Sequence, residues 1–172
     1  EIADHMLSAG ITVMMGGGLS YWIPQGHRAD EFASFTPVAG ASAESEREDS
    51  RNLLAEASAA GFHLIYNRDE LLAVSDVSRL LGLFAWSHLP YALDREPADA
   101  AGVPSLAEMT DVALNVISKN ENGFFLMVEG GRIDHAAHNH DVAAMLADAL
   151  DFDDAIGKAY AFARTHPQTA VF

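Results

Sequence analysis

The feature that most constrains the fold of this chain is an alternation of short apolar runs with longer stretches of helical periodicity. The short runs, which are typical of buried strands, are residues 11–15, 62–66, 79–84 and 124–128. The stretches with apolar side chains at helical spacing are residues 51–60, 105–118 and about 141–164. Ser105 and Glu108 fit the pattern of a capping box at the start of the second stretch. This alternation predicts an α/β fold in which helices pack on both faces of a sheet.

The irregular parts of the sequence indicate one domain that is incomplete. Three consecutive glycines at residues 16–18 lack a following Lys-Ser or Lys-Thr pair, so we interpret them as a tight turn after a strand rather than a phosphate cradle. Residues 24–49 combine Gly, Ser, Pro and charges with weak periodicity, which indicates an irregular surface excursion within a single domain spanning residues 1–172. Residues 1–8 already have a helical pattern, and residues 169–172 begin an apolar run without completing a strand. We therefore expect both ends to have been cut from something larger.

Composition excludes several classes of function. The chain has 25 acidic and 10 basic residues, a formal net charge of −15, and no cysteine. Nucleic acid is not an expected partner, because phosphate backbones require clustered positive charge. No apolar run approaches the roughly 20 residues of a membrane span, and any metal must be held by His, Asp or Glu. The acidic surface fits either adaptation to concentrated salt or ordinary acidic solubility.

The chemistry is concentrated in residues 124–138, where an apolar run leads directly into acids, glycines and imidazoles. Glu129 follows the last residue of the run, in the place where α/β proteins collect ligands beyond the carboxyl ends of their strands. Asp134 and His138 are four residues apart, so in a helix both side chains point the same way, and a carboxylate with an imidazole suits zinc. Spacing alone leaves His135 and His140 as competing ligands. It also leaves the alternative that Asp134 is a helix N-cap with His138 in a surface contact.

Residues 124–154 and Ile156 closely resemble a segment of alkaline phosphatases that reads Val-Glu-Gly-Gly-Arg-Ile-Asp-His, then a second histidine, then a long helix with a Phe-Asp-Asp-Ala-Ile patch. The resemblance extends upstream to residues 11–24, with the sequence Met-Gly-Gly-Gly-Leu-Ser-Tyr, and to residues 80–84 and 105–110. It is weakest between residues 25 and 50. It implies that the sheet is part of an alkaline-phosphatase-like sheet.

The resemblance also implies a role for each matching residue. Glu129 would be a magnesium ligand, Asp134 and His138 would bind zinc, and His135 would lie beside the substrate phosphate. The parent protein would hydrolyse phosphomonoesters through a phosphoserine intermediate, act as a homodimer, and be periplasmic or extracellular. The serine nucleophile and the remaining metal ligands of the family cannot be recognised in this chain. No catalytic residue is therefore assigned, and we expect the chain to be inactive alone and to need the remainder of the alkaline phosphatase chain.

Two other functions compete with this interpretation. One is a noncatalytic module that holds divalent ions through Glu129, Asp134 and His138. The other is a fragment of a related phosphodiesterase or sulfatase, although such relatives generally lack the full Val-Glu-Gly-Gly-Arg-Ile-Asp-His run.

Overall fold

The computed structural model describes residues 2–28, 31, 44–95 and 102–172. Its centre is a parallel sheet of three short strands in the order β1-β3-β2. The strands are β1 (Val13–Gly16), β2 (His63–Ile65) and β3 (Leu80–Leu83). Leu80 in the central strand is in register with Val13 on one side and with His63 on the other. Three of the four predicted strands are therefore confirmed, each within two residues of its expected bounds.

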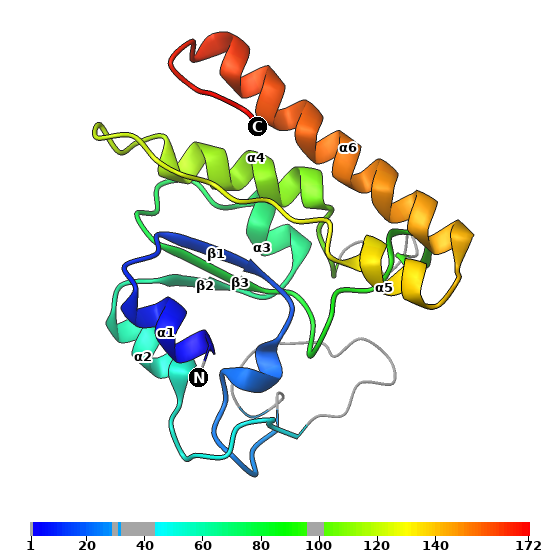
Figure 1. Ribbon diagram of the computed structural model, residues 1–172. Coiled ribbons are helices and arrows are strands. Elements are labelled where there is room, and N and C mark those ends of the chain that lie inside the picture. The colour runs from blue at the N-terminus through cyan, green and yellow to red at the C-terminus, as the bar shows by residue number, and fades with distance from the viewer. Residues whose placement is uncertain (1, 29–30, 32–43, 96–101) are drawn as a thin grey trace.

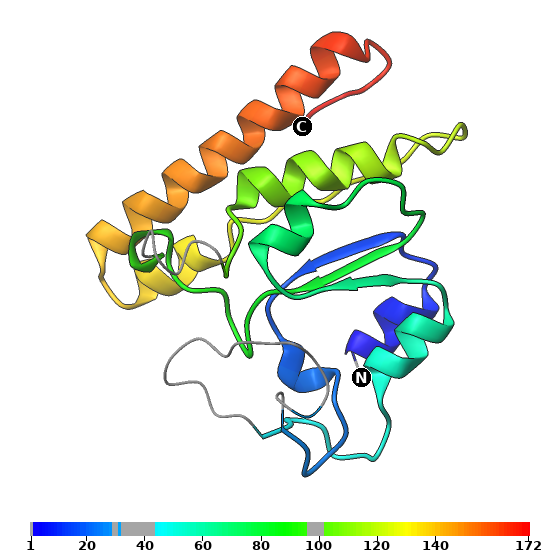
Figure 2. The same ribbon diagram turned by 180° about the vertical axis from the view of Figure 1, so that it is seen from behind.

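Helices cover both faces of this sheet, as the alternating sequence predicts (Figures 1 and 2). One face carries α1 (Ile2–Ser8) and α2 (Leu53–Ala59). The other face carries α3 (Arg68–Leu72) and α4 (Leu106–Ile117), and α6 (Val142–Thr165) packs on α4. The short α5 (Arg132–His138) packs against α6. Two 3-10 helices, η1 (Leu19–Tyr21) and η3 (Ala92–Asp94), lie in the connections.

The strands supply two separate cores because their side chains alternate between the two faces. Leu81 and Leu83 of β3 belong to the core shared with α1 and α2, whereas Leu80 and the following Phe84 belong to the core shared with α3 and α4. All four side chains are buried. The completely apolar sequence of β3 is thus explained by helices on both of its faces.

The helix ends follow the expected local chemistry. The side chain of Ser105 accepts a hydrogen bond from the backbone N–H of Glu108, and the Glu108 carboxylate accepts one from the backbone N–H of Ser105. The predicted capping box is therefore confirmed at the start of α4. Asp141 caps α6 in a similar way, because its carboxylate accepts a hydrogen bond from the N–H of Ala144.

The fourth predicted strand, residues 124–128, is not a buried strand in the structure. Phe125 is 88% exposed and Met127 is 73% exposed, whereas Phe124 contacts the ring of Phe162 on α6 with centroids 5.9 Å apart. No strand of the described residues pairs with this segment, and its backbone N–H groups have no hydrogen bond to the described part of the chain. The prediction of a buried strand here is therefore wrong, because a strand requires a partner strand to complete its ladder.

The predicted excursion at residues 24–49 is only partly described, because residues 29–30 and 32–43 lie outside the described residues. Its two ends meet: Arg28 and Glu44 form an antiparallel bridge, and the N–H of Gln25 donates to the carbonyl of Asp49 at 2.8 Å. The excursion therefore leaves and rejoins the fold at one place. Trp22 and Trp86 are both buried in the core on the α1 side of the sheet.

Residues 169–172 form no strand, and Phe172 is fully exposed. Among the helices of the described residues, none combines the length and the apolar character that a membrane crossing demands.

Candidate metal and phosphate site

Two glycines carry the chain from the exposed segment at residues 124–129 into α5. A Cβ on Gly130 would lie 2.9 Å from Cδ1 of Ile133 and 3.1 Å from Cγ of Phe152 on α6. Such distances are tighter than ordinary side-chain contacts, so any larger residue here would push Ile133 and Phe152 away from the backbone. Ala136, on the inner side of α5, is completely buried.

Asp134 and His138 lie side by side on α5, as their spacing predicts. Oδ1 of Asp134 is 3.5 Å from Nε2 of His138, and the two side chains are 74% and 80% exposed, respectively. Neither side chain has another polar contact within the described part of the chain. The alternative that Asp134 is an N-cap is wrong, because Gly131 occupies the N-cap position of α5. His140 lies beyond α5 in the left-handed region, at a φ of 56°.

His135 belongs to a different group of side chains. Its Nδ1 is 2.8 Å from Nη1 of Arg132, and its ring meets the ring of His88 edge to face with centroids 4.4 Å apart. The guanidinium of Arg132 lies over the ring of Tyr91 at 3.7 Å from the ring centre. Burial lowers the pKa of His88, and the positive charge of the nearby Arg132 lowers it further.

Glu129 is exposed and borders a small cavity of about 60 Å³ between residues 89–95, residues 103–109, the glycine turn and α6. On the α6 side this cavity is lined by Asp148 and Asp151. Asp151 is paired with Arg95, Nη2 to Oδ2 at 2.7 Å. Burial raises the pKa of Asp148, whose carboxylate accepts a hydrogen bond from the N–H of Ala92 at 3.1 Å. These two acids are thus occupied by partners of their own.

The predicted ligands are therefore brought together only in part. Asp134 and His138 form a pair, and Glu129 stands apart from it. Across residues 2–28, 31, 44–95 and 102–172, no group of three or more His, Asp or Glu side chains is arranged to hold a metal ion. A catalytic zinc site normally has three protein ligands, so the pair on α5 provides at most part of one.

Sequence reasoning missed Arg132, His88 and Tyr91. Arg132 lies inside the motif but has no metal-ligand chemistry. His88 and Tyr91 come from the irregular stretch after β3, more than 40 residues earlier in the chain. No periodicity links that stretch to α5, so only the fold shows that the two meet.

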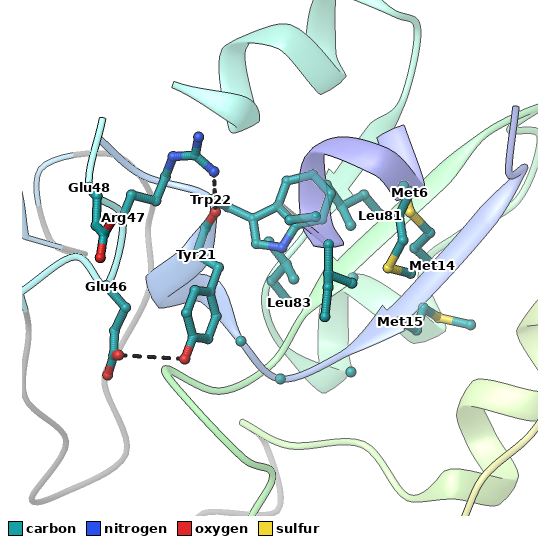
Figure 3. A pocket seen from close by; sticks show the side chains of 16 residues that line it. Met6, Met14, Met15, Tyr21, Trp22, Glu46, Arg47, Glu48, Leu81 and Leu83 are labelled. Carbon is teal, nitrogen blue, oxygen red and sulfur yellow. Dashed lines mark hydrogen bonds between the residues drawn. The ribbon is translucent and has the colours of Figure 1, made fainter. Parts of the chain in front are cut away.

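A larger cavity of about 700 Å³ lies elsewhere, between α1, the open edge of β1 and the loop at residues 46–48 (Figure 3). Its walls are mainly apolar side chains such as Met6, Met14 and Trp22. Its one arginine, Arg47, already binds Asp49 and donates to the carbonyl of Tyr21. Although residues 16–18 line this cavity, no free cation is available to hold a phosphate among the lining side chains. The interpretation of the three glycines as a turn agrees with this arrangement.

The fold and the site define an α/β protein that carries paired carboxylate and imidazole side chains directly after a β-like segment. Comparison with known proteins then identifies the family. The sequence profile of the family described as Alkaline phosphatase matches residues 1–172. The repressible alkaline phosphatase of Saccharomyces cerevisiae is 35% identical over 95% of this chain and 29% of its own length.

Solved structures agree with this result. The alkaline phosphatase of Thermus thermophilus superimposes with a TM-score of 0.79 at 36% identity, over 96% of this chain and 30% of that one. A variant of the alkaline phosphatase from the Antarctic bacterium TAB5, with Mg bound in its M3 site, gives a TM-score of 0.69 at 26% identity, over 96% of this chain and 40% of that one. The chain belongs to the alkaline phosphatase family. It spans about three tenths of the length of the curated relatives that it matches.

Proposed function

We propose that this chain is part of a metal-dependent phosphomonoesterase, to which it contributes some of the metal ligands and a contact to the substrate phosphate. The observation that carries the proposal is the pairing of Asp134 with His138 on α5, with both side chains exposed and no other polar partner among the described residues. Membership of the alkaline phosphatase family supports the reaction class. Hydrolysis would run through a phosphoserine intermediate whose serine is not recognisable in this chain.

Asp134 and His138 would hold zinc, and Glu129 would hold magnesium. The donor types fit, since zinc accepts imidazole nitrogen and carboxylate oxygen, whereas magnesium prefers carboxylates. The magnesium reported for the TAB5 variant supports the presence of that metal in the family. When bound, such ions lower the pKa of an oxygen nucleophile and stabilise negative charge on the transferred phosphoryl group. Further ligands from outside the described residues would have to complete both sites.

The residues of this chain would then act by binding and orientation. The backbone at Gly130 passes close to α6 and thereby fixes where α5 begins. α5 presents Asp134 and His138 together on its exposed side. His135, which lies between them in sequence, would contact the substrate phosphate. Its neighbour Arg132 adds a permanent positive charge next to this group, which suits a dianionic substrate.

The proposal is tested by titrating zinc into the chain and into the matched variants His138→Ala and His140→Ala. We expect weak binding to the wild type, further weakening by His138→Ala, and no change by His140→Ala. His138 is the last residue of α5 and faces Asp134, whereas His140 lies beyond the helix. Equal weakening of zinc binding by the two variants, or weakening by His140→Ala only, would show that the assignment of His138 as the zinc ligand is wrong.

A noncatalytic metal-binding module is distinguished by activity. A longer protein containing this chain should hydrolyse a chromogenic phosphomonoester, whereas the isolated chain should not. A longer protein that binds zinc at Asp134 and His138 without any turnover would favour the noncatalytic alternative.

A further inference from the structure

Arg132 contacts two neighbours, one from a distant part of the chain and one from its own helix. Its guanidinium stacks on the ring of Tyr91 at 3.7 Å, in the loop that follows β3. Its Nη1 is 2.8 Å from Nδ1 of His135, one turn further along α5. It shares the lining of the small cavity with the buried carboxylate of Asp148 on α6. A stacked and partly buried guanidinium has little freedom to turn, so its donors have fixed directions.

The contact between Arg132 and His135 determines which nitrogen of the imidazole carries the proton. A guanidinium has donors only and stays protonated in proteins, so Nδ1 of His135 must be the acceptor. A ring that accepts at Nδ1 is neutral and carries its proton on Nε2. In the described part of the chain, Nε2 of His135 has no hydrogen-bond acceptor. The geometry therefore leaves one N–H donor unused at the surface of α5.

A third side chain restricts the rotation of this ring. His88 meets His135 edge to face with centroids 4.4 Å apart and interplanar angle 68°. Arg132 on one nitrogen and His88 against the ring together define one orientation for the imidazole. Orientation matters for binding an anion, because a hydrogen bond weakens steeply when its donor points away from the acceptor.

We propose that Arg132 is a positioning residue that holds His135 as the Nε2–H tautomer, so that this nitrogen donates a hydrogen bond to a non-bridging oxygen of the bound phosphoryl group. The inference rests on the proposed phosphatase function for the identity of the anion. Tyr91 would act one step further away by holding the guanidinium. A purely structural role for Arg132, attaching α5 to the loop at residues 88–95, would make no difference to the His135 tautomer.

The proposal is tested by substituting Arg132 with side chains that differ in their capacity to donate a hydrogen bond to His135. Lysine is donor-only and should keep Nδ1 as the acceptor. The amide of Arg132→Gln can donate or accept a hydrogen bond, and the side chain of Arg132→Met can do neither. Both variants should therefore allow His135 to adopt either tautomer. Arg164→Met is the matched control, since it removes an arginine from the exposed last turn of α6. The ring nitrogens of His135 are observed by NMR in the longer protein with ¹⁵N-labelled histidine, and are assigned with His135→Gln.

We expect a single Nε2–H tautomer in the wild type, in Arg132→Lys and in Arg164→Met, and a mixture of tautomers in Arg132→Gln and Arg132→Met. Inhibition by inorganic phosphate should weaken about tenfold in the Gln and Met variants, as expected for the loss of one hydrogen bond to a charged group, and should not change in Arg164→Met. If Arg132→Met does not fold, Arg132→Gln, whose side chain is shorter and neutral but still polar, supports the same comparison.

An unchanged His135 tautomer in Arg132→Gln would overturn the positioning role whatever the activity of the protein. A released tautomer without any change in phosphate inhibition would overturn the anion contact. By contrast, a wild-type protein with the expected tautomer but without phosphomonoesterase activity would refute the proposed function and not the link between Arg132 and His135. The two failures are therefore distinguishable.

Discussion

The close approach of Gly17 to the loop after β3 gives the sharpest test of the fold. A Cβ at Gly17 would lie 2.0 Å from the carbonyl oxygen of Ser87 and 3.1 Å from its carbonyl carbon. Ordinary contact begins at 3.4 Å, and the obstructing atoms are backbone, so no side chain can move aside to make room. In Gly17→Ala the two segments must therefore separate by more than an ångström.

The cost of that separation follows from the hydrogen bonds between the two segments. The N–H groups of Gly18, Leu19 and Ser20 donate to the carbonyls of residues 87, 85 and 86 at 2.7, 3.1 and 3.0 Å, respectively. At about 1 kcal/mol for each bond, losing all three lowers the free energy of unfolding by about 3 kcal/mol. In a chain of this size, that loss corresponds to a decrease of roughly 6–12 °C in the midpoint of thermal unfolding.

Urea unfolding followed by circular dichroism measures the effect, and Gly16→Ala is the matched control. A Cβ at Gly16 would meet nothing within 4 Å, so the control should change the free energy of unfolding by less than about 0.5 kcal/mol. If the two alanine variants have the same stability, residues 17–20 and 85–87 are not in contact as described, and the reasoning is refuted.

Three further predictions test other parts of the structure. Burial raises the pKa of Asp148, so folding favours its neutral form over its ionised form. The neutral carboxyl therefore contributes stability at a pH below its unfolded pKa, and this contribution is lost as the pH rises through the folded pKa. Asp148→Asn keeps an acceptor for the N–H of Ala92. In urea unfolding, the free energy of unfolding of this variant minus that of the wild type should therefore be larger at a pH of about 7 than at about 3. The reverse order would contradict the prediction. Gly130→Ala should lower the free energy of unfolding by about 1–2 kcal/mol because it crowds Phe152, whereas Gly131→Ala, with contacts no shorter than 3.6 Å, should have little effect; equal losses would argue against the close packing. If the net charge of −15 reflects adaptation to salt, the thermal midpoint should rise between low and molar NaCl, and a flat or falling midpoint rejects that idea.

Local sequence patterns predicted most of the helices and strands, because these elements depend largely on residues close together in the chain. The apolar run in β3 and the helical spacing in α4 both identify buried faces, and the Ser105–Glu108 capping box is a contact within one helical turn. The segment at residues 124–128 shows the limit of this reasoning. Its composition is β-like, yet whether it becomes a strand depends on a partner strand, and its own sequence contains no information about one.

The candidate site likewise has one part that could be predicted from the sequence and one part that could not. The pairing of Asp134 with His138 follows from helical geometry within α5, and the sequence predicted it correctly. The surroundings of His135 were not predictable, because His88 and Tyr91 reach it through the fold from more than 40 residues away. The roles of Glu129, Asp134, His135 and His138 in binding metal and phosphate stay predictions.

The central claim is that α5 supplies zinc ligands to a phosphomonoesterase, and one measurement tests it directly. The longer protein containing this chain is stripped of metal with a chelator, and hydrolysis of a chromogenic phosphomonoester is then followed as zinc and magnesium are returned. We predict that activity disappears on chelation, returns with both metals in the wild type, and fails to return in Asp134→Ala and His138→Ala while His140→Ala recovers. Full recovery of activity in Asp134→Ala and His138→Ala would contradict the account.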